Sequence, residues 1–150
     1  MTILDALSLV IVDEPGRARN ALRTMLVSTQ NVRIVDLFDT CSDLNLWMSY
    51  CFPDVVVISE RSMRGECRPL LKSIKAAYPR SRFLVILEKS DQAQAWLAQG
   101  ADQVFLKGFS SSELFALMDQ WSMDKMMHNF SDGQMQPPPF ERSSYMEITT

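Results

Sequence analysis

Charged and hydroxyl-bearing side chains directly follow three separate apolar runs, and together they could handle a phosphoryl group. Asp13 and Glu14 follow the run 9–12, Ser59 follows the run 55–58, and Lys107 follows the run 103–106. An acid pair offers the oxygen ligands that Mg²⁺ prefers. A lysine ammonium would neutralise the charge of a phosphate. The residue between the acid pair and the lysine, Ser59, carries a neutral hydroxyl, which lacks the nucleophilicity of a carboxylate.

The elements that would position these side chains alternate along the chain. The sequence predicts five strands, at 7–12, 32–38, 54–59, 83–87 and 103–106. Helical patterns lie between them: one after Gly16, one near 42–50, one from about Pro69, one at 91–99, and one from Ser110 onward. This alternation predicts an α/β fold, flavodoxin-like, with a five-stranded parallel sheet in the order 2-1-3-4-5. In such sheets a site lies beyond the carboxyl ends of the strands.

Local signals mark the ends of the helices and of the domain. Ser110 with Glu113 three residues later is a capping box, and Gly100 should end the preceding helix. After about residue 127 the pattern of strands and helices stops. We therefore predict one domain over 1–127, followed by a linker or disordered tail over 128–150 that contains three consecutive prolines.

Composition excludes several classes of function. The net charge of −3 over 150 residues argues against a broad basic face for nucleic acid. No apolar run approaches the ~20 residues that span a bilayer, so no membrane association is expected. Three cysteines lack the spacing of a metal or redox motif, and His128 is the single histidine. We therefore expect reduced thiols, a cytoplasmic location, no metal and no cofactor.

The acid pair, the strand-end position of Ser59 and the Lys107 region together resemble the response-regulator receiver domain over roughly residues 7–127. The segment from Gly100 to Lys107, with Glu113 following, is similar to receivers that precede a LuxR-type helix-turn-helix. The resemblance implies an Mg²⁺-binding acid pair, an acceptor aspartate, a hydroxyl after the fourth strand, a switch aromatic and a lysine.

The chain departs from that pattern at three positions. Ser59 replaces the acceptor aspartate, Leu87 followed by Glu88 replaces the hydroxyl, and Val104 replaces the switch aromatic. An alcohol cannot form an acyl phosphate, and a leucine cannot hydrogen-bond to phosphate. The positions therefore predict a degenerate phosphorylation pocket, in which Lys107 forms an ion pair with Asp13 or Glu14.

Apolar residues beyond a single core-facing stripe predict a partner surface on the last helix. Leu114, Leu117, Met118 and Trp121 have the spacing of core residues. The remaining apolar residues of this region, assigned to partner binding, are Trp96, Phe115, Met123, Met126 and Met127. Receivers dimerise through their fourth helix, fifth strand and fifth helix, so the resemblance implies a dimer surface here.

Three functions remain open at this point. The first is an atypical, phosphorylation-independent receiver of a transcriptional regulator. It would act as a homodimer or with a related regulator, and would reach DNA only through a C-terminal domain outside this chain. The second is a stand-alone protein–protein adaptor. The third is a phosphorylatable receiver that uses Glu60, which should point to the opposite face from Ser59. The first two functions require no enzyme active site, and we expect no enzymatic activity.

Overall fold

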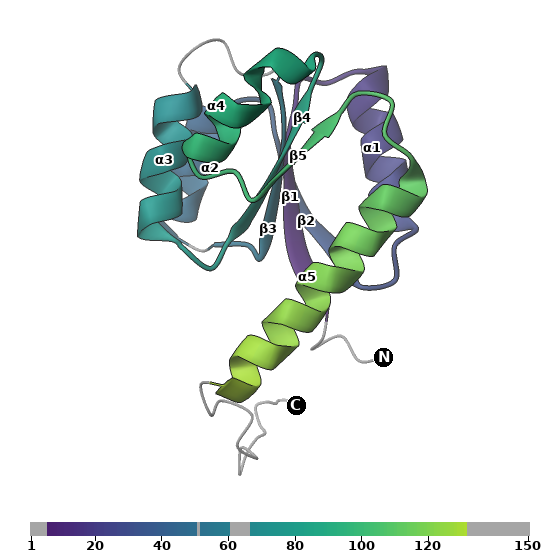
Figure 1. Ribbon diagram of the computed structural model, residues 1–150, viewed down its shortest axis with the longest axis vertical. Helices are drawn as coiled ribbons and strands as arrows, with labels where there is room; N and C mark the ends of the chain where they lie inside the picture. The colour runs from purple at the N-terminus through teal and green to yellow at the C-terminus, as the bar shows by residue number, and fades with distance from the viewer. Residues whose placement is uncertain (1–5, 51, 61–66, 132–150) are drawn as a thin grey trace.

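The computed structural model describes residues 6–50, 52–60 and 67–131, with side chains omitted for 67–68 and 129–131. Five parallel strands form one sheet in the order β2-β1-β3-β4-β5, as predicted (Figure 1). Their bounds are β1 Leu7–Val12, β2 Val32–Phe38, β3 Val55–Ser59, β4 Arg82–Leu87 and β5 Gln103–Leu106. Each differs from its predicted range by at most one residue at one end.

Helices cover both faces of the sheet. They are α1 Arg17–Val27, α2 Cys41–Met48, α3 Cys67–Ala77, α4 Ala93–Ala98 and α5 Ser111–Ser131, with a short 3₁₀ turn, η3, at Ser90–Gln92. In Figure 1, α2, α3 and α4 lie on one face of the sheet, and α1 and α5 lie on the other. This is the two-sided cover that parallel strands require, because both faces of such strands are apolar.

Two hydrophobic clusters fill the spaces between the sheet and its helices. All five residues of β3 are buried, so this strand contributes to both clusters. Val56 and Ile58 join the cluster under α2, α3 and α4, whereas Val55 and Val57 join the cluster under α1 and α5. Alternate side chains of a strand point to opposite faces, which explains the division. The continuous apolar run is therefore the mark of the central strand.

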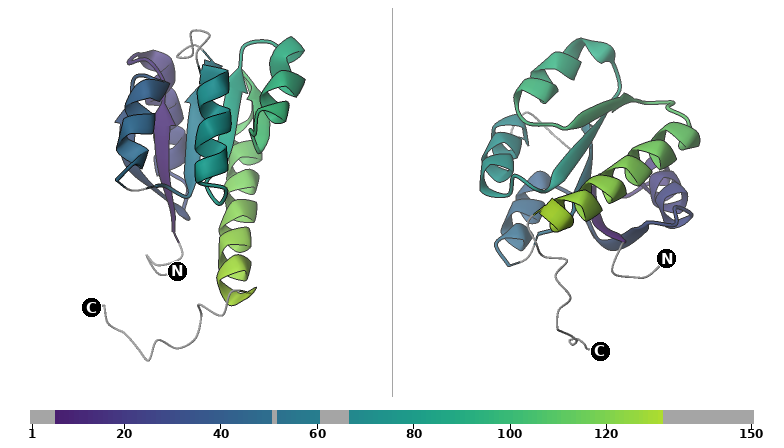
Figure 2. Two further views of the ribbon diagram at one scale, coloured as in Figure 1. Left: turned by 90° about the vertical axis from the view of Figure 1, so that its left-hand side faces the viewer. Right: turned by 60° about the horizontal axis from the view of Figure 1, so that its bottom comes forward.

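Helix α5 is longer than the sheet is tall. Its first turn is capped as predicted, because the Ser110 hydroxyl accepts a hydrogen bond from the Glu113 amide at 3.2 Å. The core-facing residues Leu114, Met118 and Trp121 are buried in its first half. Beyond them the helix projects past the amino edge of the sheet (Figure 2). It runs to Ser131, four residues past the predicted domain boundary at 127.

The elements around α4 and α3 differ slightly from the prediction. Helix α3 begins at Cys67, two residues before Pro69, so Pro69 lies within the first turn, where a missing amide costs nothing. Helix α4 spans six residues instead of the predicted nine, because its first residues form the 3₁₀ turn. Gly100 ends it with φ of 115°, in a backbone region that favours glycine.

Cys41, the first residue of α2, is buried and disulfide-bonded. The prediction of reduced thiols is therefore wrong for this residue. Sequence spacing tests only for close pairs, whereas the fold can bring distant cysteines together. Cys51 and the side chain of Cys67 lie outside the described part of the chain, as does the predicted tail from 132 onward. Among the described residues, no helix is long and apolar enough to cross a membrane.

Candidate functional site

The strand register brings the predicted site residues to one edge of the sheet. Strands β1 and β3 are paired with their carboxyl ends level, which places Asp13 beside Ser59. Ser59 in turn pairs with Ile86 of β4. The Lys107 amide donates a hydrogen bond to the Leu87 carbonyl at 2.8 Å, so β5 ends beside β4. The predicted pocket is thus assembled from four adjacent strand ends.

The acid pair has one buried and one exposed member. Asp13 is buried, and its Oδ1 accepts a hydrogen bond from the Glu14 amide at 2.8 Å. Glu14 is exposed. Arg19 of α1 lies across this corner: its Nη1 donates to the Asp13 carbonyl at 3.3 Å and forms an ion pair with Asp39 at 2.9 Å. A fixed guanidinium therefore stands beside the acid pair.

Ser59 ends β3 with only 6% of its surface exposed. Its side chain sits among the ends of the central strands, at the position that the resemblance assigns to the phosphoryl acceptor. A buried hydroxyl adds no charge to this place. The carboxylates at the centre of the site are therefore reduced to the acid pair.

Leu87 and Lys107 do not face the acid pair. Leu87 is fully buried in the cluster under α2, α3 and α4, where it packs with residues such as Trp96. The Lys107 side chain is 66% exposed, and its Nζ lies 3.6 Å from Glu88 Oε1. The prediction that Lys107 pairs with Asp13 or Glu14 is wrong. The reason is that Glu88, one residue past β4, lies next to the end of β5 and is the nearer carboxylate.

The side chains of Glu60 and Val104 contact neighbouring parts of the fold. One carboxylate oxygen of Glu60 accepts a hydrogen bond from the Glu88 amide at 3.1 Å, which ties the end of β3 to that of β4. Val104, at the switch position, is partly buried against the α4 side of the core. A β-branched side chain packed in this way has no ring to rotate between two states. In this structure both residues hold the sheet edge together.

Of the residues assigned to partner binding, the methionines of α5 are exposed and Trp96 of α4 is buried. Trp96 is 3% exposed and belongs to the core, so its assignment to partner binding is wrong. On a six-residue helix only one side can face the sheet, and the largest apolar residue takes that side. On α5, Met123 is 57% exposed, Met126 39% and Met127 58%. Phe115 is partly buried.

Two exposed leucines extend this surface and were missed from the sequence. Leu97 of α4 and Leu106 of β5 are both at least 40% exposed. The signal was present: Leu97 follows Trp96 directly, and two neighbouring residues of a helix cannot both face the core. Leu106 is the last residue of β5, an edge strand that has a neighbouring strand on one side only. Among the described residues, no group of three or more His, Cys, Asp or Glu side chains is placed to hold a metal ion.

Comparison with known structures defines the class of fold. The regulatory domain of the protein mrkE from Klebsiella pneumoniae superposes with a TM-score of 0.70 at 15% identity, covering 79% of this chain and 97% of that one. A DNA-binding response regulator of the LuxR family from Staphylococcus aureus gives a TM-score of 0.67 at 17% identity, covering 77% and 98%. The chain therefore has the fold of response-regulator receiver domains.

Comparison of sequences gives one particular relative. The chain is 28% identical over 118 residues to a Ycf55-like protein from Synechocystis sp. (strain ATCC 27184 / PCC 6803 / Kazusa). The match covers 76% of this chain but only 21% of that protein, so the chain spans about a fifth of its length. No protein-family model matches the sequence.

Proposed function

We propose that this chain is a pseudo-receiver: a regulatory binding module that keeps the receiver fold and does not accept a phosphoryl group. The observation that carries the proposal is the buried Ser59 at the carboxyl end of β3. Phosphoryl transfer to a receiver requires a carboxylate nucleophile and a cation held by carboxylates. Ser59 supplies neither the nucleophile nor a charged ligand.

The surroundings of Ser59 support the same conclusion. The position after β4 that would offer a hydroxyl is Leu87, which is turned into the core. The lysine that would meet the phosphate, Lys107, lies near Glu88. Three separate parts of the phosphorylation site would have to change before the chemistry could proceed. Restoring one of them should therefore not restore phosphorylation.

We propose that regulation proceeds through constitutive association of the α4-β5-α5 face, defined here by Leu97, Leu106, Met123 and Met126. All four side chains are exposed apolar groups on neighbouring elements. Exposed methionines adapt to different partners, and exposed apolar groups favour contact with protein. The partner is a second copy or a related regulator. In a transcriptional regulator this module would supply dimerisation, and DNA binding would belong to a separate domain.

Two experiments test the two halves of the proposal. Ser59→Ala should leave regulation in the cell unchanged, and acetyl phosphate should not label the protein; radiolabel incorporation at the level of a control receiver would contradict this. Met123→Asp with Met126→Asp should give a folded monomer by light scattering. Leu46→Asp is the matched control, because Leu46 is also an exposed apolar residue but lies on α2. A dimer that persists in the double variant, or that dissociates in the control variant, would contradict the assignment of the α4-β5-α5 face as the dimer interface.

A cytoplasmic location belongs to the proposal as well. Stable disulfides are rare in the reducing cytosol, and those that form there are mostly transient. The bond at Cys41 should then be reversible in the cell. Alkylation of the protein before and after reduction, followed by mass spectrometry, measures this. A fully oxidised Cys41 in freshly lysed cells would contradict the cytoplasmic assignment.

A further inference from the structure

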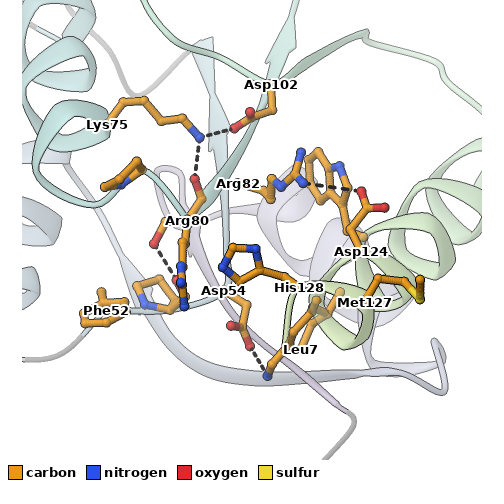
Figure 3. Close-up of a pocket in the computed structure, with 15 residues that line it drawn as sticks. Leu7, Phe52, Asp54, Lys75, Arg80, Arg82, Asp102, Asp124, Met127 and His128 are labelled. Atoms are coloured by element: carbon orange, nitrogen blue, oxygen red, sulfur yellow. Dashed lines mark hydrogen bonds and ion pairs between the residues drawn. The ribbon is translucent and has the colours of Figure 1, made fainter. Parts of the chain in front are cut away.

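A cavity of about 780 Å³ lies at the opposite end of the molecule from the degenerate pocket. It opens beneath the amino ends of β3 and β4, and the last turns of α5 form one wall because that helix projects past the sheet (Figure 3). Sites for small molecules commonly have volumes of roughly 300–1,000 Å³. The cavity therefore has the size to admit a molecule as large as a nucleotide.

Two of the acidic groups in the cavity are held by lysines. Lys75 Nζ lies 2.9 Å from Asp102 Oδ2 and also donates to the Ser81 carbonyl at 2.8 Å. Lys125 Nζ lies 2.8 Å from Asp54 Oδ2, on the far side of the cavity. These pairs tie the walls together, since they join α3 to the start of β5 and α5 to the start of β3. The carboxylates are thereby neutralised and the wall is built before any ligand arrives.

Arg82 has more guanidinium donors than its contacts within the described residues use. Its guanidinium makes a single ion pair, in which Nη2 lies 3.4 Å from Asp124 Oδ2, and both side chains are about two-fifths exposed. The same group lies 6.0 Å from the centre of the Trp121 ring, which fixes its orientation. A guanidinium carries five N–H donors in a planar fork that matches carboxylate and phosphate oxygens. Arg82 is thus oriented, yet most of its donors point at no protein acceptor in the described residues.

The charge of the lining favours an anion. Four lysine and arginine side chains face three aspartates, which leaves one positive charge in excess. The fourth cation is Arg80, at the exposed rim. In Figure 3 the Arg82 guanidinium is directed toward Asp124, and all of these cations lie around the space of the cavity. An oxyanion entering this space would meet more cations than carboxylates.

An aromatic ring offers a platform at the same rim. Phe52 is 60% exposed, although a phenylalanine ring is normally buried. One face of its ring is stacked on Tyr78, with centroids 5.4 Å apart and an interplanar angle of 28°. The stacking holds the ring in place while leaving much of it open to the cavity. A planar group of a ligand could stack on such a fixed ring.

We propose that this cavity binds a small molecule that joins a planar ring to an oxyanion, with the oxyanion on the Arg82 guanidinium and the ring against Phe52. Phosphate and carboxylate share the chemistry that Arg82 recognises, so the ligand is a nucleotide-like phosphate or an aromatic carboxylate. The cavity is separate from the degenerate pocket, and it shares the last turns of α5 with the α4-β5-α5 face. Binding here would give the pseudo-receiver a chemical input in place of phosphorylation.

Isothermal titration calorimetry on the full 150-residue chain tests the proposal with four probes: AMP, indole-3-acetate, adenosine and inorganic phosphate. AMP or indole-3-acetate should bind saturably, at least roughly tenfold more tightly than adenosine or phosphate alone. The better of the two identifies the oxyanion. No saturable binding of either ring-bearing anion overturns the proposal. Equal binding of phosphate alone also overturns it, because the ring would then contribute nothing.

Variants locate the binding. Arg82→Gln should weaken binding by roughly tenfold or more, because the charged fork is lost. Arg33→Gln is the matched control, since Arg33 is an exposed arginine on β2, at the other edge of the sheet. Phe52→Leu should weaken binding several-fold and alters only an exposed side chain, so it serves if Arg82→Gln does not fold. Equal losses in the control and in Arg82→Gln, or no loss in Phe52→Leu, would overturn the assignment of the site.

Discussion

Replacing Ser59 with aspartate would restore the missing carboxylate, and we expect it to destabilise the domain. The new side chain would be placed at a position with 6% exposure, beside the buried Asp13. Burial and a neighbouring carboxylate both disfavour an ionised acid. The pKa of the introduced carboxyl should therefore lie well above its unfolded value of about 3.9.

The size of the effect follows from that pKa difference. If the folded pKa is raised by about two units, the variant loses about 2.7 kcal/mol of unfolding free energy at pH 8. Below about pH 3.9 both folded and unfolded states are protonated, so the penalty vanishes there; it grows as the pH rises through the folded pKa and is constant above it. At pH 5 the loss should be about 1.5 kcal/mol.

Magnesium at saturating concentrations should offset this loss. Ser59→Asp places a third carboxylate next to Asp13 and Glu14, which together form the oxygen donor set of a receiver cation site. At a concentration a hundred times its dissociation constant, a bound ion contributes about 2.7 kcal/mol. Wild-type protein, which has Ser59 in place of that third carboxylate, should be stabilised much less.

Urea unfolding at pH 5 and pH 8, with and without Mg²⁺, measures all of these quantities. Ser59→Asn is the matched control, because it has the shape of aspartate without the charge, and its stability should not depend on pH relative to wild type. If Ser59→Asp were as stable as Ser59→Asn at pH 8 without Mg²⁺, the strand end would be an open, well-solvated place. The argument from burial and charge would then be refuted.

Three further predictions concern an ion pair, two glycines and magnesium binding. Lys125→Met should lower the unfolding free energy by about 1 kcal/mol, because Asp54 loses its ion pair at 2.8 Å. Lys72→Met, at an exposed lysine, should have no effect. Equal losses in the two variants would contradict a stabilising role of the Lys125–Asp54 ion pair. Gly100→Ala should cost more than Gly108→Ala, since both have positive φ but only at Gly100 would a Cβ meet Lys75, at 3.1 Å; the reverse order in thermal unfolding would contradict this. Mg²⁺ should give the wild type no saturable change in tryptophan fluorescence, and binding at an affinity usual for receivers would contradict that expectation.

The fold was predictable because its signals are local and repeated. The strand bounds follow from apolar runs between turns, and β3 was recognisable as central because the run from Val55 to Ile58 is continuously apolar. The hydrogen bond from Glu113 to Ser110 followed from a spacing of three residues. These features depend on near neighbours in the sequence, so one sequence is enough to predict them.

The contacts of the site were less predictable because they depend on distances across the fold. Lys107 has three carboxylates near its strand end in the topology, and only the structure distinguishes Glu88 from Asp13 and Glu14. Trp96 and Leu97 are adjacent and similar in character, so composition alone could not say which is buried. The cavity at the amino edge brings together segments far apart in sequence, for which no spacing rule applies, and no closely spaced pair of cysteines indicated the disulfide of Cys41.

The central claim is that this receiver fold works without phosphorylation, and one measurement tests it most directly. Size-exclusion chromatography with light scattering would be run on the full chain, with and without Mg²⁺ and beryllofluoride, which mimics the phosphoryl group. The account predicts the same molecular mass under both conditions, set by the α4-β5-α5 face alone. A change in mass that requires both Mg²⁺ and beryllofluoride would show that the pocket around Ser59 still binds the phosphoryl mimic, and it would contradict the account.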